Sequence, residues 1–282
     1  MSRVLLAVDL SYQVYRAAAA HPMLTCGDVF TGGLYGFFQT LGKMVRETEA
    51  THLVFCQDRK PYLRSLTYPE YKQLRKKAAD EELLERYTQS MELVLETLTK
   101  LRAPIWGLDG FESDDMIAHA VGKYWTRFDR IYAGSNDSDL FQWLNIPNFY
   151  IYTKDIASCW TRVRLWKEHG ITPEQYMLAT ALTGTHNDIA GIERVGPVTA
   201  IKAVKDPGLM RGLRDKHAAI IDRNLALIKL PHAQFPPEER LPDFPAGFNA
   251  RDLYRLLGRY EIDVTSAMVS AFEQVQPKQS RR

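Results

Sequence analysis

The sequence predicts an α/β fold, with a mostly parallel central sheet flanked by helices. Short apolar runs alternate with helical patterns over roughly the first 160 residues. Helix-spaced apolar residues, such as those from Leu34 to Val45, lie between the runs. Strands that alternate with helices form parallel sheets covered on both faces. The runs typical of buried strands are Val4–Val8, Leu53–Gln57, Ile131–Gly134 and Phe149–Tyr152.

Acidic residues follow or flank these apolar runs. Ligands bind beyond the carboxyl ends of parallel strands, so we expect the acids to meet at that edge of the sheet. Carboxylates packed together repel unless cations neutralise them, and oxygen ligands suit Mg²⁺ or Mn²⁺. Two such ions are a standard device for cutting phosphodiesters. The acids are Asp9, Asp58, Glu112, Asp114, Asp115, Asp137 and Asp139.

Each acidic motif also has a purely structural explanation. Ser113 can be the N-cap of a helix whose first turn carries Asp114 and Asp115. The Asp137 and Asp139 pair can be a solvated turn. Only the combination of these motifs favours a metal site.

Composition sets broad bounds. The 282 residues suffice for one large or two modest domains. Contents of 45% hydrophobic and 25% charged residues are ordinary for a soluble globular protein. The formal net charge is +2. Cys26, Cys56 and Cys159 lack zinc or redox spacing, so we expect reduced, mostly buried thiols. The amino-terminal apolar run is too short for a signal peptide, and no run approaches a membrane span. We therefore expect a cytoplasmic protein.

A basic segment follows Asp58. From Arg59 to Lys77 there are seven Lys or Arg and one acid, Glu70. A solvated basic helix start is the commoner meaning of such a run. The position straight after Asp58 favours a phosphate-binding arm, whose tyrosines can stack on unpaired bases. These tyrosines are Tyr62, Tyr68 and Tyr71.

The pattern becomes helical after about residue 160. We expect helices at Pro173–Leu182 and Pro197–Val204, with a glycine-punctuated segment, Gly184–Gly196, between them. Its glycines permit a tight hairpin whose amides can hold a DNA phosphate, and a plain interhelical turn is the alternative. The five prolines of Pro231–Phe248 predict an extended connection before a last helix at Arg251–Tyr260.

In this order the segments resemble the 5′ nuclease (flap endonuclease) superfamily, which includes bacteriophage 5′-exonucleases and the 5′-nuclease domain of bacterial DNA polymerase I. The resemblance runs from about Val4 to Val204. Arg16 lies where the family often has a basic residue. The residues that match family motifs are Asp9; Asp58, Arg64, Tyr71, Lys72 and Arg75; Glu112-Ser113-Asp114-Asp115; and Asp137 and Asp139, followed by Leu140-Phe141-Gln142.

The glycine-rich segment departs from the family pattern. Thr185 occupies the first aspartate position, and Arg194 replaces the middle glycine of the hairpin. Matching Asp188 to the second aspartate requires a one-residue deletion, whereas an ungapped match from Gly196 places Asn187 there. The second metal site is therefore expected to be weaker than the first, or filled only with DNA bound.

The resemblance implies a structure-specific 5′ nuclease, both 5′-3′ exonuclease and flap endonuclease, that hydrolyses DNA in replication or repair with two Mg²⁺ (or Mn²⁺) ions. Lys72 and Arg75 would stabilise phosphate charge in catalysis. The first metal site would comprise Asp9, Asp58, Glu112, Asp114 and Asp115. The second would comprise Asp137, Asp139 and Asp188. The implied DNA-binding residues are Arg16, Arg64, Tyr71, Lys76, Gly191, Arg194, Gly196 and Lys202.

The resemblance also implies the organisation of the chain. Residues 1–165 would form the nuclease core, with a helical arch over about residues 65–101 that gates a single strand. Residues 166–282 would form a helical part with a helix–hairpin–helix at about 174–205, where a K⁺ ion can bind. The partner would be DNA with a 5′ flap, 5′ overhang or single-stranded 5′ end, with an RNA–DNA hybrid as a second substrate. The protein would act as a monomer in a bacterial or phage-infected cell.

Three rival functions follow from the same residues. A non-catalytic protein that binds flaps or gapped DNA is favoured by Thr185, and opposed by the retention of every other acid. A PIN-like ribonuclease would share the acid cluster but needs neither arch nor glycine hairpin. A phosphatase with its nucleophile in an Asp-x-Asp motif is disfavoured, because Asp9 is followed by Leu10 and Ser11.

Overall fold

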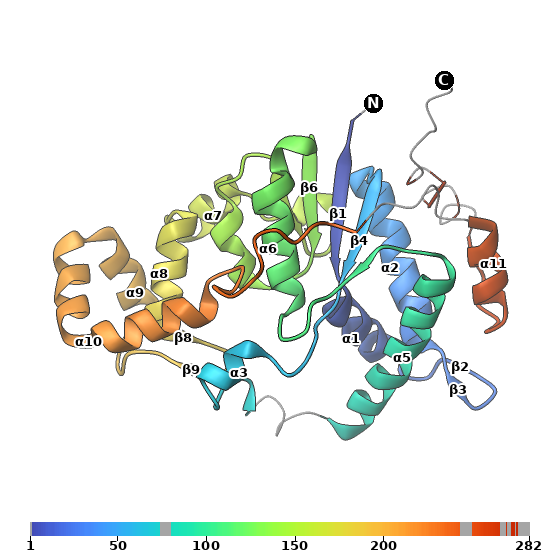
Figure 1. Ribbon diagram of the computed structural model, residues 1–282, viewed down its shortest axis with the longest axis horizontal. Helices are drawn as coiled ribbons and strands as arrows, with labels where there is room; N and C mark the ends of the chain where they lie inside the picture. The colour runs from blue at the N-terminus through green and yellow to red at the C-terminus, as the bar shows by residue number, and fades with distance from the viewer. Residues whose placement is uncertain are drawn as a thin grey trace.

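The computed structural model describes residues 2–73, 80–242 and 250–265, together with 269, 272, 273 and 275. A parallel sheet of five strands, in the order β5-β4-β1-β6-β7, forms its centre (Figure 1). The strands are β1 (Val4–Asp9), β4 (His52–Cys56), β5 (Ile105–Trp106), β6 (Arg130–Gly134) and β7 (Phe149–Tyr152).

The middle strand, β1, is a continuous apolar run because both faces of the sheet are covered. Leu6 and Val8 belong to one core cluster, and Leu5 and Ala7 to the other. All four side chains are fully buried. The alternation follows from the two-residue period of a strand.

The helices α1, α2, α5 and α11 pack on the core of the first face (Figure 1). A small antiparallel hairpin, β2 (Thr25–Cys26) and β3 (Val29–Phe30), joins the first two of these helices. The bounds are α1 (Leu10–Ala20), α2 (Gly32–Thr48), α5 (Glu81–Lys100) and α11 (Ala250–Gly258).

The second face is covered mainly by α6 (Ser113–Tyr124), whose Met116, Ile117 and Val121 join Leu5 in the core. The described residues also form several short helices. They are α3 (Leu63–Thr67), η1 (Trp125–Arg127), η2 (Ser138–Trp143) and η3 (Ile156–Ser158).

The remaining helices lie beside the sheet, on the side away from α2 and α11 (Figure 1). Three of them pack around a cluster that includes Leu182, Ile192, Ala200 and Ile221. No helix in the described ranges is long and apolar enough to cross a membrane. The bounds are α7 (Arg162–His169), α8 (Pro173–Thr183), α9 (Pro197–Lys205) and α10 (Pro207–Ile228), with a two-stranded hairpin of β8 (Gly184–Thr185) and β9 (Ile189–Ala190) between α8 and α9.

The predicted fold class is confirmed, and each of the four predicted strands is present within about one residue of its expected bounds. The hairpin β2–β3, the two-residue β5 and the helix α10 were not predicted. The last helix, expected at Arg251–Tyr260, is α11. All three cysteines are free, and Cys56 and Cys159 are buried as expected.

The predicted arch over about residues 65–101 includes, at its carboxyl end, a helix that packs on the core. Most of that segment is α5, whose Val94 and Leu98 are fully buried in the core. A free-standing helix would have no reason to bury these side chains. The arch itself, the division at residues 165/166 and the helix–hairpin–helix stay predictions, and residues 74–79 lie outside the described part of the chain.

Candidate active site

Acidic side chains gather at the carboxyl edge of the sheet. Asp9 is the last residue of β1 and the N-cap of α1, while Asp58 follows β4 and Asp137 follows β6. Glu112 and Asp114 lie at the start of α6. Because parallel strands end at one edge, residues far apart in sequence are brought together here.

Asp9 is buried, with 5% of its surface exposed. Its Oδ1 accepts hydrogen bonds from the Tyr12 amide at 3.1 Å and the Ser113 hydroxyl at 3.0 Å, and its Oδ2 accepts one from the Ser135 hydroxyl at 3.0 Å. Burial and the nearby charge of Asp58 nevertheless raise the pKa of Asp9 to about 7. Burial and the nearby carboxylate together therefore outweigh these hydrogen bonds.

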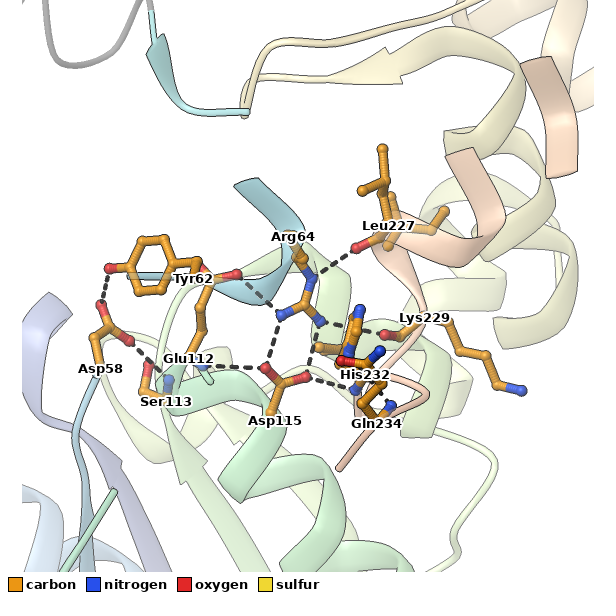
Figure 2. Close-up of polar contacts among 12 residues, drawn as sticks. Asp58, Tyr62, Arg64, Glu112, Ser113, Asp115, Leu227, Lys229, His232 and Gln234 are labelled. Carbon is orange, nitrogen blue, oxygen red and sulfur yellow. Dashed lines mark hydrogen bonds and ion pairs between the residues drawn. The ribbon is translucent and has the colours of Figure 1, made fainter. Parts of the chain in front are cut away.

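Ser113 connects two of the acids. In addition to its hydroxyl bond with Asp9, its backbone amide donates to Asp58 Oδ1 at 2.7 Å (Figure 2). The Tyr62 hydroxyl donates to the other oxygen of Asp58 at 3.3 Å. The expectation that Ser113 is the helix N-cap is wrong, because Glu112 is the N-cap and Ser113 is the first helical residue.

Asp114 has a buried carboxylate oxygen, Oδ1, with no hydrogen-bond partner. Burial and the charges of Asp137, Asp9 and Asp58 raise the pKa of Asp114 well above its ordinary value. A buried acceptor without a partner is costly in free energy. A bound cation would relieve both the missing contact and the repulsion.

Asp137 and Asp139 lie at the start of η2, as expected from their spacing. The Asp139 amide donates to Asp137 Oδ1 at 2.8 Å. Burial and Asp137 raise the pKa of Asp139 to about 8, against the opposing influence of Arg64 and Lys72. The turn interpretation and the metal interpretation are thus compatible. Asp137 caps the turn, while the raised pKa of Asp139 shows that negative charge is crowded there.

Glu112 is held by three side chains. Its Oε2 accepts from Arg64 Nη1 at 3.0 Å and from the Tyr71 hydroxyl at 2.8 Å, and its Oε1 pairs with Lys72 Nζ. The ammonium of Lys72 also lies 5.2 Å from the centre of the Tyr62 ring and 5.3 Å from that of Tyr71. Lys72 therefore reaches the acids, where it can compensate negative charge.

The burial of Arg64 and Tyr71 argues against the prediction that they contact DNA. Arg64 is 3% exposed and Tyr71 is 4% exposed. Both side chains point into the acid cluster and bond Glu112 instead of facing solvent. The basic segment does lie next to the acids, as expected. Arg64, however, neutralises buried carboxylates and does not face solvent.

Asp115 is fully buried and differs from its neighbour Asp114. Both of its oxygens bond the Arg64 guanidinium, and they also accept from the backbone amides of Glu112 and His232 (Figure 2). A carboxylate bonded in this way has no lone pair free for a cation in this arrangement.

The hairpin β8–β9 reaches the acid site through Lys72, whose backbone amide donates to the Asn187 carbonyl at 3.0 Å. The Asn187 side chain is 3% exposed, and its Oδ1 has no hydrogen-bond partner. Asp188 is half-buried, with a φ of 64°. Asn187 and Asp188, the two candidates for the second aspartate position of the family pattern, thus lie in one turn beside Lys72.

The other predicted DNA-binding residues lie on the surface, apart from the half-buried Gly191. Arg16, Arg194 and Lys202 are exposed, and the side chain of Arg194 is 91% accessible. Gly196 is exposed at the N-terminus of α9. Arg75 and Lys76 lie outside the described residues.

A divalent ion fits the chemistry of this site. No three His, Cys, Asp or Glu side chains of the described residues form a group that could hold an ion by themselves. Mg²⁺ keeps several of its waters and commonly uses only one or two carboxylates, so a closed protein cage is unnecessary. The unpaired oxygen of Asp114 is the observation that favours a cation here.

Sequence reasoning did not identify Ser113 and Ser135 as site residues. Both donate hydroxyl hydrogen bonds to Asp9. The available signal was position, because Ser135 directly follows β6 and Ser113 lies inside the acidic motif. A serine is too common in turns for that signal to be specific.

The fold and site define an α/β protein with a carboxylate site at the end of a parallel sheet. Residues 4–170 match the family described as 5′-3′ exonuclease, N-terminal resolvase-like domain, and the chain belongs to that family. It is 29% identical over 214 residues to a 5′-3′ exonuclease of Aquifex aeolicus, covering 75% of this chain and 72% of the relative. It is also 29% identical over 217 residues to DNA polymerase I of Mycobacterium bovis, covering 75% of this chain and 24% of that much longer relative.

Solved structures share the fold. The bacteriophage T5 D15 flap endonuclease, in a complex with DNA and metal ions, matches with a TM-score of 0.68 and 20% identity over 81% of this chain and 90% of that one. Flap endonuclease-1 from Methanococcus jannaschii matches with a TM-score of 0.60 and 13% identity over 97% and 92% of the two chains. At these identities the likeness establishes the architecture alone.

Proposed function

We propose that this protein is a metal-dependent, structure-specific 5′ nuclease, acting as 5′-3′ exonuclease and flap endonuclease on DNA in replication or repair. The observation that carries the proposal is the carboxylate cluster around the unpaired oxygen of Asp114. Membership of the 5′-3′ exonuclease family supports hydrolysis of phosphodiesters as the chemistry.

Two Mg²⁺ (or Mn²⁺) ions are proposed as cofactors. The first would be held by Asp9, Asp58, Glu112 and Asp114, partly through waters, and the second by Asp137, Asp139 and Asp188. When bound, such ions lower the pKa of an attacking water and stabilise the leaving oxygen. Asp115 is left out of the first set, because its four hydrogen bonds occupy both oxygens.

Lys72 supplies a positive charge for the scissile phosphate. Its ammonium pairs with Glu112, and a phosphate that enters the acid site can replace this contact. A positioned cation stabilises charge that develops in the transition state. We propose the same role for Arg75.

The duplex is proposed to bind across the hairpin and α9. Arg194 is exposed before α9, Lys202 is exposed in the last turn of that helix, and Arg16 is exposed on α1, the helix whose N-cap is Asp9. Cations of this kind contact phosphates without reading sequence. The proposed partners are DNA with a 5′ flap, 5′ overhang or single-stranded 5′ end, and RNA–DNA hybrids, with a K⁺ ion at the hairpin and the protein acting as a monomer in the cytoplasm.

The first experiment is single-turnover cleavage of a labelled 5′-flap duplex, with Mg²⁺ or with EDTA, beside an Asp9→Asn control. We expect Mg²⁺-dependent cutting near the flap junction that the variant loses. Uncut substrate in Mn²⁺ as well as Mg²⁺, despite tight binding, would contradict the nuclease and favour a protein that binds flaps without cutting them.

That alternative has one specific observation in its favour. Asp188 is the carboxylate that this hairpin offers to a second ion. Thr185 and Asn187, which match aspartate positions of the family pattern, are neutral. An Asp188→Asn variant tests whether this residue serves the second ion. Unchanged turnover and unchanged dependence on metal concentration would remove Asp188 from the site.

A further inference from the structure

The Arg64 guanidinium has the most hydrogen-bond partners of any side chain at the acid site. We propose that Arg64 and Asp115 form a positioning pair, which fixes Glu112 and ties it to the end of α10, and that neither residue contacts DNA or metal. This inference rests on the proposed nuclease, since it concerns the support of a carboxylate in the same site.

The contacts of Arg64 use its full donor capacity. An arginine offers five N–H groups in a rigid fork. Nη1 donates to Asp115 Oδ2 at 2.7 Å and to Glu112 Oε2 at 3.0 Å, and Nη2 donates to Asp115 Oδ1 at 2.8 Å. Nε donates to the Leu227 carbonyl at 2.8 Å, and Nη2 also to that of Lys229 at 3.3 Å. No donor is left for a phosphate.

Asp115 is satisfied to the same degree. In addition to the two-pronged contact with Arg64, its Oδ1 accepts from the His232 amide at 2.7 Å and its Oδ2 from the Glu112 amide at 3.1 Å. A carboxylate accepts about four hydrogen bonds in total. Coordination of a metal would require Asp115 to break this network while fully buried.

The network joins two distant parts of the chain (Figure 2). Leu227 lies near the end of α10, and Lys229 and His232 follow it. Glu112 lies at the start of α6, among the proposed ligands. Helix α10 packs against α8 and α9 in one apolar cluster. The helices proposed to hold the duplex are thus connected to Glu112 through the Arg64 guanidinium.

The fork of Arg64 is essential to this connection. A lysine carries its three donors on one nitrogen and cannot bridge two carboxylates and two carbonyls in a plane. Loss of the fork would remove one of the three side chains that hold Glu112, without removing any proposed ligand. A supporting residue of this kind typically costs about 10- to 100-fold in activity when it is replaced.

The test compares neighbours on one helix. Mn²⁺ binding to the DNA-free protein would be measured by electron paramagnetic resonance for wild type, Asp115→Asn and the matched control Asp114→Asn. We expect Asp114→Asn to weaken Mn²⁺ binding strongly, and Asp115→Asn to weaken it far less while kcat on flap DNA falls by about 10- to 100-fold. Equal loss of Mn²⁺ affinity in both variants would make Asp115 a ligand and overturn the inference.

A second measurement covers the case in which Asp115→Asn fails to fold. The double variant Arg64→Gln with Asp115→Asn removes both charges together, which avoids leaving one buried and unpaired. If the two residues act as a unit, its kcat should be no lower than that of Arg64→Gln alone. Losses that multiply, or full activity in Arg64→Lys, would contradict the pair.

Failure of the proposed nuclease activity would give a different experimental result from failure of the positioning role. A folded wild-type protein that binds no Mn²⁺ and cuts no flap DNA would overturn the proposed nuclease, and the positioning role with it. Wild-type cleavage with an Mn²⁺ site that depends on Asp115 would overturn only the positioning role.

Discussion

Lys72 is a partly exposed cation at the acid site. It pairs with Glu112, and its side chain is 20% exposed, so it is accessible to a substrate that enters the site. An Lys72→Ala variant should lower kcat by about 10²- to 10³-fold, as expected for loss of one charge-stabilising donor. Duplex affinity should change much less. Single-turnover rates and equilibrium binding to flap DNA check this separation.

Lys60 provides a matched comparison. It is an exposed cation of the same basic run, with its ammonium 5.9 Å from the centre of the Tyr62 ring. Lys60→Ala should weaken binding at most and leave kcat unchanged. If Lys72→Ala lost rate and affinity in equal measure, Lys72 would be only a binding residue.

Gly191 is required for close approach of two chain segments. A Cβ there would lie 2.2 Å from the carbonyl carbon of Thr183, at the end of α8. Gly191→Ala should therefore destabilise the protein by about 1–3 kcal/mol, because a fixed backbone contact would have to give way. Urea unfolding followed by circular dichroism measures this loss.

Gly196 is the control for the same hairpin. A Cβ at this position meets nothing within 4 Å, and its φ is −85°. Gly196→Ala should change stability by less than about 0.5 kcal/mol. Equal stability of the two variants would show that the hairpin can relax around Gly191.

Helix α5 illustrates what packing decides at the scale of an element. Residues 81–100, part of the expected helical arch, are helical, but Val94 and Leu98 are buried in the core cluster that α1 and α2 share. Leu98→Ala should cost about 2–5 kcal/mol, as for other large-to-small changes in a core. The free energy of unfolding in urea gives the value directly.

The exposed Glu92 on the same helix is the control. Glu92→Ala should stay within about 0.5 kcal/mol of wild type. A small effect of Leu98→Ala, similar to that of Glu92→Ala, would mean that α5 detaches from the core in solution and forms part of a longer arch.

The carboxylate cluster connects metal binding to the stability of the whole molecule. An ion that binds only the folded state stabilises it, by about 2.7 kcal/mol at 100 times its dissociation constant. Mg²⁺ should therefore raise the melting temperature by about 2–4 °C for each kcal/mol gained. Thermal unfolding with Mg²⁺ and with EDTA is the measurement.

Asp114→Asn makes this experiment specific. The variant removes charge at the crowded site, so it should melt higher than wild type in EDTA and respond less to Mg²⁺. An Mg²⁺ response as large as that of wild type would place the ion away from Asp114.

The strands and the acids that follow them were predictable because both signals are local. A buried parallel strand is a short apolar run, and the residue after it lies at the ligand-binding edge wherever the strand sits in the sheet. Asp9, Asp58 and Asp137 were located correctly for this reason. The roles of individual residues depend on burial and partners, which are not local.

The sequence by itself determined the fold class, the edge of the sheet that carries the acids, and the basic segment beside them. Only the tertiary structure distinguished Asp114, with an unpaired oxygen, from its neighbour Asp115, with none. It likewise showed that Arg64, expected to contact DNA, is buried and donates to a carbonyl 163 positions later in the chain. The physical reason is that charge and residue type are fixed by sequence, whereas solvent access and hydrogen-bond partners arise only when distant segments pack together.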